Sequence, residues 1–368
     1  MRNQMDLTKN GFKSLILGLA IALPISFLSG CSDSRKNTSQ PQSVDQTSTS
    51  KTNSRLDQII ARGKLVCGVS GELPGFSFVD QNGKYSGLDV DFCRAIAAAL
   101  FDNPNAVDYR NLNAKERFTA LQSGEIDILS RNTTWTISRQ TSNGMEFAPI
   151  VFYDGQGIMV LANQKAKGIE GLNNASICAQ TGTTAELNLA DQMRKRKLSY
   201  KPVTFEDINA TFAAYEAGRC QAITADRSAL IVRRTRLAKP ADHVVLDTLL
   251  SKEPLAPAVL SGDSKWANVV KTVIYAAIAA EELGINSQNL GKMSTSENGE
   301  VLRFLGKEGD LGKNIQLSPD FAYRIIKHLG NYGEIYDRNL GKNSPLKLER
   351  GLNKLWNDGG LMYSPPFR

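Results

Sequence analysis

Histidine is nearly absent from the 368-residue chain, which contains only His243 and His328. Neither the C-x-x-C nor the H-E-x-x-H spacing occurs, so a zinc site or a histidine-based catalytic triad has little material. The net charge of +7 comes from dispersed basic residues, apart from a short cluster at residues 194–197. We interpret that cluster as a solvated helix face and not as a nucleic-acid patch. We therefore expect no metal, no cofactor and no nucleic-acid partner.

The apolar run from Leu15 to Phe27 is too short to span a bilayer comfortably, and it follows Lys9 and Lys13, as is typical of an export signal. The run leads into residues 28–31, Leu-Ser-Gly-Cys, which resemble the bacterial lipobox. This resemblance implies a lipoprotein signal peptide over residues 1–30 and a lipidated Cys31 that anchors the protein to a membrane outside the cytoplasm. A plain signal peptide with an accidental cysteine is the alternative.

Residues 31–54 consist mostly of Ser, Thr, Gln, Asn and Lys. Such a segment has too few apolar side chains to offset the entropy cost of folding, so we expect a flexible tether. About 310 residues remain from Arg55 onward, a length that favours two domains over one.

Two consecutive β/α units are expected at the start of this folded part. A strand at Leu65–Val69 precedes a helix of regular apolar spacing, for which Asp89 is the expected N-cap. A second helix at Glu116–Gln122 precedes a short apolar strand at Ile126–Leu129. Alternating helices and strands predict an α/β fold.

Similar wiring recurs later in the chain. A helix that ends near Gly218 leads into a strand at Ala222–Ala225, and another strand is expected at Ser176–Ala179. This recurrence favours two α/β lobes of similar construction. Towards the C-terminus we expect helices around Phe321–Leu329 and Gly351–Asn357 that pack on the first lobe, with no assigned chemistry.

The chain is expected to cross between the lobes twice, near Phe152–Gly157 and back near Lys252–Pro257, where two prolines interrupt regular structure. Two crossings predict a two-strand hinge. The first lobe would then contain residues 55–154 and 255–368, with a helical C-terminal extension, and the second lobe residues 155–254.

Beyond Cys31, the chain has an even number of cysteines, Cys67, Cys93, Cys178 and Cys220, which suggests two disulfides in an exported protein. The count alone allows three pairings. Because the first two lie on the first strand and the helix after it, and the last two lie on or beside strands of the second lobe, we predict pairing within each lobe.

Polar residues follow three of the expected strands. In open α/β sheets, ligands bind beyond the carboxyl ends of strands. Thr134 and Arg139 follow the strand that ends at residue 129, Thr184 follows the strand that ends at residue 179, and Asp226 follows the third. An arginine can take a carboxylate in bidentate fashion, and an aspartate can take an ammonium, so this set suits a zwitterion. A helix cap at residues 182–184 and a surface position for Arg139 are the structural alternatives.

Several segments also carry a resemblance to a known family: residues 73–77, 87–91, 133–139, 181–184, 214–219 and 359–363. They resemble the amino-acid-binding proteins of ABC importers, extracellular solute-binding protein family 3, and are most similar to its general L-amino-acid-binding subfamily. The resemblance implies a two-lobed periplasmic-binding-protein fold of type II. It also implies an extracytoplasmic protein that is not an enzyme, captures free polar L-amino acids such as glutamate, glutamine, aspartate and asparagine, and delivers them to a membrane permease.

The resemblance implies roles for the residues at the strand ends. Arg139 and Thr134 match positions that bind the ligand α-carboxylate, and Thr184 matches a second-lobe hydroxyl that helps them. Asp226 matches the partner of the α-amino group.

Three further residues are implied in the site by the same resemblance. Phe76 matches the wall against which the ligand side chain packs, and Arg117 matches an arginine that reaches the side-chain carboxylate in relatives with acidic ligands. Asn132 replaces a common serine and keeps a backbone carbonyl role. A solvated Arg117 paired with Glu116 or Asp127 is the alternative.

An enzyme is the rival class, because the same fold resembles that of certain cyclic-acid dehydratases. Such an enzyme needs a general acid in the cleft, for which Glu186 or Glu72 are the candidates. A polar tether behind a lipobox fits capture and delivery better than catalysis.

Overall fold

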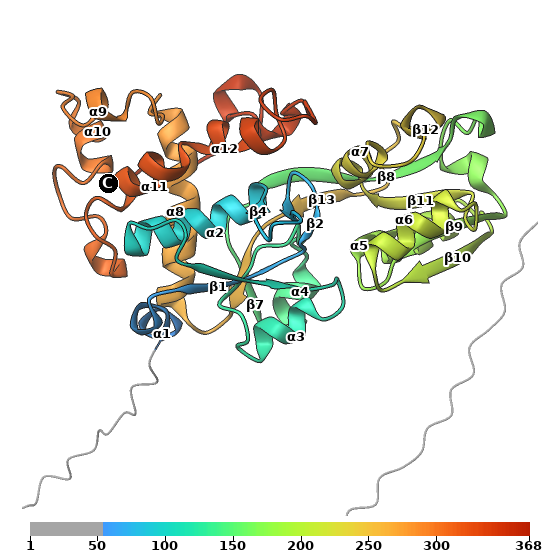
Figure 1. Cartoon of the computed structure of the whole chain (residues 1–368), viewed down its shortest axis with the longest axis horizontal. Helices are drawn as coiled ribbons and strands as arrows, with labels where there is room; N and C mark the ends of the chain where they lie inside the picture. Colours follow the sequence, from blue (N-terminus) through green and yellow to red (C-terminus); the bar gives the residue numbers. More distant parts are fainter. Residues whose placement is uncertain (1–53) are drawn as a thin grey trace, which may run out of the picture. The chain divides into compact units, whose positions relative to one another are not determined.

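A computed structural model of the chain describes residues 54–368, which form two α/β lobes (Figure 1). The expected signal peptide, Cys31 and nearly all of the tether lie outside the described residues. Within residues 54–368, no helix combines the length and the apolar character needed to cross a membrane.

The first lobe is built on a mixed five-stranded sheet. Its strands are, in spatial order, β5 (Val107–Asn111), β1 (Leu65–Val69), β6 (Ile128–Leu129), β14 (Ala258–Leu260) and β7 (Met145–Phe147). β1 is buried throughout and runs parallel to both neighbours. Gly68 in β1 leaves no room for a side chain, because a Cβ there would lie 2.5 Å from the Ile126 side chain. A small antiparallel sheet adds β2 (Glu72–Leu73), β3 (Ser77–Val79) and β4 (Tyr85–Ser86).

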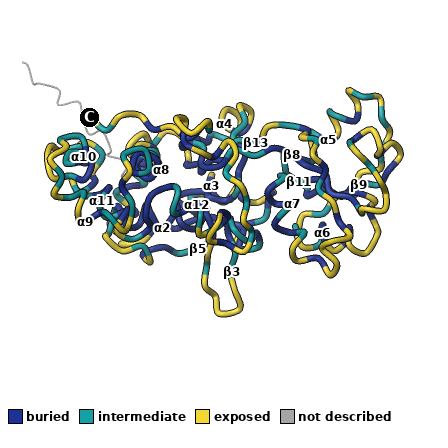
Figure 2. The backbone as a smooth tube through the Cα atoms, turned by 90° about the horizontal axis from the view of Figure 1, so that it is seen from above, coloured by how far each residue is buried: buried dark blue, intermediate teal, exposed yellow. Residues whose placement is uncertain are grey.

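Helices of the first lobe surround this sheet: α1 (Arg55–Arg62), α2 (Leu88–Phe101), α3 (Arg117–Gln122), α4 (Ile137–Ser142) and α8 (Ser264–Glu282). α2 is buried along nearly its whole length (Figure 2). The expectation that Asp89 caps α2 is wrong. The helix begins after Gly87, with no side-chain cap, and the buried Asp89 carboxylate accepts a hydrogen bond from the backbone N–H of Asn132 at 3.0 Å.

The second lobe contains the other large sheet, with the order β10 (Tyr200–Phe205), β9 (Ala175–Gln180), β11 (Ala222–Asp226), β8 (Phe152–Leu161) and β12 (His243–Val245). β9 runs parallel to β10 and β11, so the carboxyl ends of these three strands meet at one edge. Its helices are α5 (Thr184–Lys195), α6 (Ile208–Glu216) and α7 (Arg227–Arg234).

The predicted crossing segments are both strands. β13 (Lys252–Leu255) pairs antiparallel with the start of β8, with Lys252 opposite Gly155 and Leu255 opposite Phe152. The two strands form the predicted two-strand hinge. We propose residues 55–154 with 255–368 as the first lobe and residues 155–254 as the second.

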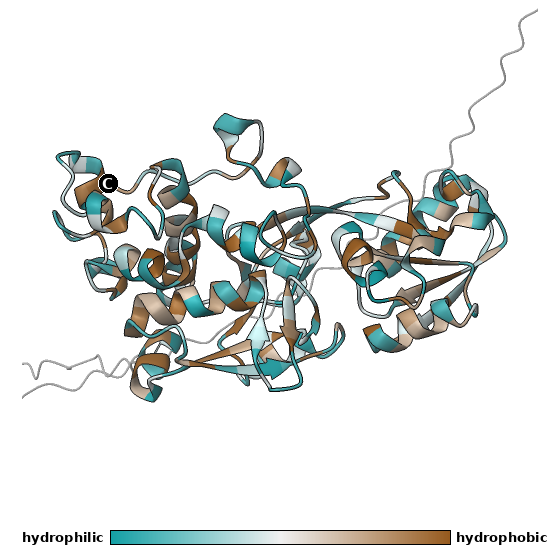
Figure 3. Cartoon of the chain, turned by 45° about the horizontal axis from the view of Figure 1, so that its top comes forward, coloured by the Kyte–Doolittle hydropathy of each residue, from teal (hydrophilic) through white to brown (hydrophobic). Residues whose placement is uncertain are grey.

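The C-terminal part continues through α9 (Leu290–Met293), α10 (Gly299–Phe304), α11 (Phe321–Leu329) and α12 (Tyr332–Asn339). The apolar residues of α8 are buried, and α8 packs against α2, α11 and α12 (Figure 3). The expected helix α11 is confirmed. The expected helix at Gly351–Asn357 is wrong: two short 3₁₀ turns are separated by Lys354 and Leu355, whose extended backbone interrupts helical hydrogen bonding.

Both predicted disulfides are confirmed. Cys67 in β1 is joined to Cys93 in α2, and Cys178 in β9 is joined to Cys220, which precedes β11. In the chain-entropy model, closing loops of this length contributes about 3 to 4 kcal/mol each. Each bridge strengthens one lobe and leaves the hinge unconstrained.

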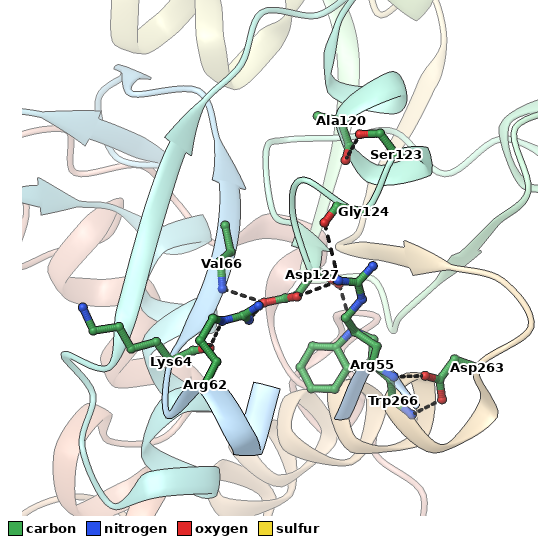
Figure 4. A network of polar contacts seen from close by, with 10 residues as sticks. All are labelled: Arg55, Arg62, Lys64, Val66, Ala120, Ser123, Gly124, Asp127, Asp263 and Trp266. Atoms are coloured by element: carbon green, nitrogen blue, oxygen red, sulfur yellow. Dashed lines mark hydrogen bonds and ion pairs between the residues drawn. The ribbon is translucent and has the colours of Figure 1, made fainter. Parts of the chain in front are cut away.

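A polar network at Asp127 ties α1 to the sheet and to α8 (Figure 4). The carboxylate is almost completely buried and pairs with Arg55 and Arg62. The carboxylate also accepts a hydrogen bond from the backbone N–H of Val66 at 2.7 Å. The backbone carbonyl of Asp127 accepts a hydrogen bond from Trp266 Nε1 at 2.8 Å.

Replacing this carboxylate should therefore destabilise the fold. We expect Asp127→Asn to lower the free energy of unfolding by about 2 to 4 kcal/mol, because two guanidinium groups lose their counter-charge beside a buried donor. Urea unfolding with the disulfides intact measures this change in the free energy of unfolding. The matched control, Asp108→Asn, removes an exposed pair with Lys64 and should cost less than about 1 kcal/mol. Equal effects of the two substitutions would contradict the structural role of Asp127.

Candidate ligand-binding site

A cavity lies between the two lobes, at the strand ends that the sequence singled out. Its lining includes five of the expected site residues: Arg117, Asn132, Thr134, Thr184 and Asp226. β6 leads into the first-lobe segment that contains Asn132 and Thr134, while β9 and β11 lead to Thr184 and Asp226 in the second lobe. Ligands of open α/β sheets bind at such an edge.

Asp226 contributes a buried carboxyl group to the cavity. Burial, followed by the neighbouring acids Asp154 and Glu253, raises the pKa of this carboxyl group to about 8. Asn132 Nδ2 donates across the lobes to Asp226 Oδ2 at 3.2 Å. The carboxyl group is therefore oriented from the opposite lobe, and within residues 54–368 it makes no ion pair that would hold it ionised at neutral pH.

Arg117 lines the cavity and is only 3% exposed. Its Nη1 donates to the carbonyl of Arg131 and, at 3.2 Å, to Thr133 Oγ1, while its Nε has no partner within the described chain. The surface alternative is wrong, because these contacts leave out both Glu116 and Asp127. Burial lowers the pKa of the guanidinium group, and the charges of Arg139 and Arg131 lower it further.

Two further arginines, which the sequence analysis did not place in the site, also line the cavity. Arg131 is 4% exposed and donates from Nε to the carbonyl of Leu112 at 2.7 Å. Arg233 of α7 donates to Asn209 Oδ1 and, across the lobes, to the carbonyl of Glu72 at 2.8 Å. Arg131 lies two residues after the end of β6, in the segment that leads to Thr134. Asp226 ends β11 immediately before α7, and Arg233 lies seven residues later, a spacing of about two helical turns that could have revealed it.

The two remaining expected residues do not line the cavity. Arg139 is buried behind Thr134, where its Nη1 donates to the Thr134 carbonyl at 2.8 Å and its guanidinium lies 5.2 Å from the centroid of the Phe118 ring. Phe76 lies in the core of the first lobe, edge-on to Phe152 at 5.2 Å between ring centroids. We therefore leave Phe76 out of the proposed site.

Glu253 was also missed, although it contacts two of the expected residues. This carboxylate on β13 is 1% exposed. Its Oε2 accepts from Thr134 Oγ1 at 2.6 Å and from Thr184 Oγ1 at 2.7 Å. The two hydroxyl groups, which belong to different lobes, therefore share one buried acceptor.

The two acids considered for catalysis do not line the cavity. Glu186 accepts from the backbone N–H of Gly182 at 3.0 Å at the start of α5. Glu72 contributes its carbonyl to Arg233, and burial raises the pKa of its side chain.

Comparison with known proteins places the chain among binding proteins. The model of the bacterial extracellular solute-binding proteins, family 3, matches residues 65–292. A general L-amino acid-binding periplasmic protein of Rhizobium johnstonii is 50% identical over 315 residues, which cover 85% of this chain and 92% of the relative. A glutamate/glutamine/aspartate/asparagine-binding protein of Rhodobacter capsulatus is 46% identical over 86% of this chain and 94% of the relative.

A solved structure gives the same picture. An ABC transporter periplasmic binding protein from Brucella ovis, with glutathione bound, has a TM-score of 0.84 and 50% identity, and the match covers 86% of this chain and 99% of that one. These relatives are solute-binding proteins and not enzymes, so the dehydratase alternative is set aside. The chain belongs to the bacterial extracellular solute-binding proteins of family 3.

Proposed function

We propose that the protein is the solute-binding component of an ABC importer and that it captures free polar L-amino acids outside the cytoplasm for a membrane permease. The glutamate, glutamine, aspartate and asparagine group is the preferred class. The observation that carries this proposal is the set of ionisable groups that line the cavity: the Asp226 carboxyl group on the second lobe, the guanidinium groups of Arg117 and Arg131 on the first lobe, and that of Arg233 at the far end of α7. The names of the relatives support the same class.

The charged groups of the proposed ligand are opposite in sign to the groups of the cavity that they would contact. A buried charge without a partner is costly, and removing one partner of a buried pair costs about 3 to 5 kcal/mol. An α-ammonium group would pair with Asp226, and acidic groups would meet Arg117 and Arg131. Arg139 adds a positive charge one layer behind Thr134. Attachment to the membrane through Cys31 belongs to the same proposal.

Calorimetric titration with a panel of amino acids tests the proposal. Glutamate, aspartate and their amides should bind well. Leucine and lysine should bind less well, because the leucine side chain leaves the Arg117 guanidinium group unpaired and the lysine side chain opposes it with like charge. Glutathione belongs in the panel, since its γ-glutamyl end carries the same ammonium and carboxylate. Failure of every amino acid to bind would overturn the proposal.

Arg117 should determine the preference for acidic side chains. We expect Arg117→Met to weaken binding of glutamate and aspartate by about tenfold to a hundredfold, because a charged hydrogen bond is lost in a buried site. Small neutral amino acids such as alanine should change by only a few-fold. The matched control, Arg194→Met, alters an arginine whose side chain is 80% exposed, and it should change the affinity for neither class of amino acid. An equal loss for all amino acids would remove Arg117 from the side-chain site.

Asp226 should make the affinity depend on pH. Without ligand its raised pKa, about 8, keeps it largely protonated at pH 7, whereas pairing with an ammonium requires the carboxylate. Affinity for glutamate should therefore rise with pH by up to about tenfold per unit below the pKa, and level off above it. Titrations between pH 6 and pH 8.5 measure this slope. Asp226→Asn should bind weakly and with a flat profile, and a flat profile in the wild type would contradict the assignment.

A further inference from the structure

We propose that the C-terminal segment and α8 form a second binding site, separate from the cavity between the lobes, for a methylated ammonium group such as that of choline. The site is a hollow of about 250 Å³ near the C-terminus of the chain (Figure 1). Its lining includes two aromatic residues, Trp356 and Tyr363, and two acids, Glu282 and Glu300. Aromatic faces attract organic cations, and carboxylates attract them through opposite charge.

A tight turn brings the two aromatic rings together. Trp356 donates its backbone N–H to the carbonyl of Met362 at 3.0 Å. Gly360 has no room for a side chain, because a Cβ there would lie 1.9 Å from a backbone carbonyl oxygen. Leu355 and Met362, which are 5% and 1% exposed, anchor the turn in the core of the first lobe. The turn contains residues 359–363, which do not line the cavity between the lobes.

The aromatic rings are exposed although the turn that carries them is anchored. Trp356 and Tyr363 are 57% and 59% exposed. Their ring centroids lie 5.8 Å apart and the ring planes are inclined at 76°, so the rings form two walls of a corner. A side-chain hydrogen bond from Trp356 to Glu282 orients the indole ring. A cation in this corner would therefore contact both rings in positions that the fold already fixes.

The two acids of the hollow carry charge that the described chain does not neutralise. Glu282 accepts hydrogen bonds, among them one from the backbone N–H of Ser364 at 3.3 Å, but within residues 54–368 neither Glu282 nor Glu300 belongs to an ion pair. The adjacent Glu281, by contrast, is paired with Arg350. Burial raises the pKa of the Glu282 carboxyl group, and the charge of Glu281 raises it further. A cation in the hollow would stabilise both carboxylates.

The composition of the hollow favours a methylated ammonium group over a primary one. A primary ammonium group is strongly hydrated and has three hydrogens that need acceptors. Ring faces accept hydrogen bonds only weakly, and Glu282 already accepts from other groups. Methyl groups need no acceptor, and they can contact the two rings and the apolar surfaces of Pro365 and Pro366, which also line the hollow. Aromatic cages recognise quaternary ammonium ligands in this way.

The first test compares choline with ethanolamine, which has the same skeleton without the methyl groups. In the isotope-labelled full chain, the indole N–H resonance of Trp356 is the one that Trp356→Phe removes, and its shift measures binding at constant ionic strength. Choline should bind with a dissociation constant on the order of 1 mM, and ethanolamine should bind at least about fivefold more weakly. Equal affinities for the two amines, or no shift of the Trp356 resonance with choline, would overturn the inference.

Substitutions test the aromatic and the acidic part of the site separately. Tyr363→Leu and Glu300→Gln should each weaken choline binding by about threefold to tenfold, because one removes an aromatic face and the other a negative charge. Tyr363→Phe should keep the affinity, since a phenyl face also attracts a cation. The matched controls are Leu361→Ala, on the same turn, and Glu297→Gln, both at exposed positions outside the lining of the hollow. Equal losses in the controls and in the site variants, or no loss in Tyr363→Leu, would overturn the site.

Free organic cations and phosphatidylcholine headgroups share this chemistry, and a second measurement distinguishes the two sources. Sedimentation with phosphatidylcholine vesicles compares the wild type with Tyr363→Leu. If choline binds, co-sedimentation that Tyr363→Leu reduces by about threefold or more assigns the headgroup as the ligand. Choline binding without such a difference between the two proteins assigns a free methylated cation. These results do not depend on whether the cavity between the lobes captures amino acids.

Discussion

A charge buried between the two lobes must find a partner, and the arrangement around the cavity follows from this constraint. Asp89 accepts the backbone N–H of Asn132, Arg131 donates to a backbone carbonyl, and Glu253 is saturated by four donors. Among the residues that the structure describes, Asp226 and Arg117 are satisfied only in part, because Asp226 accepts from the Asn132 amide and Arg117 Nε has no partner. The incomplete pairs line the cavity, and the proposed ligand, which has both signs of charge, would complete them.

The fold keeps these groups on separate bodies. The disulfides Cys67–Cys93 and Cys178–Cys220 lie within single lobes, and the antiparallel pair of β8 and β13 connects the lobes. Each lobe therefore holds its own charged residues on a framework that a disulfide cross-links. The hinge strand β13 also carries Glu253, so one short segment both links the lobes and orients polar groups from each.

Much of this arrangement could be predicted from the sequence, because it depends on local patterns. An apolar run predicts strand β1, and the position of Asp226 follows because it comes directly after another apolar run. The pairing of the cysteines follows from the predicted elements on which they lie. Glu253 could not be found in this way, because its partners Thr134 and Thr184 lie 119 and 69 residues away. The prediction that Asp89 caps α2 was wrong for a related reason: its carboxylate accepts a hydrogen bond from the backbone N–H of Asn132, 43 residues away. The roles of polar residues at the cavity depend on which distant donors the fold brings to them.

A crystal structure of the protein with L-glutamate bound would test the central claim most directly. The account predicts the ligand nitrogen within about 3 Å of the Asp226 carboxylate, with the acidic groups on the side of Arg117 and Arg131. A ligand ammonium directed away from Asp226, or acidic groups placed away from both arginines, would contradict it.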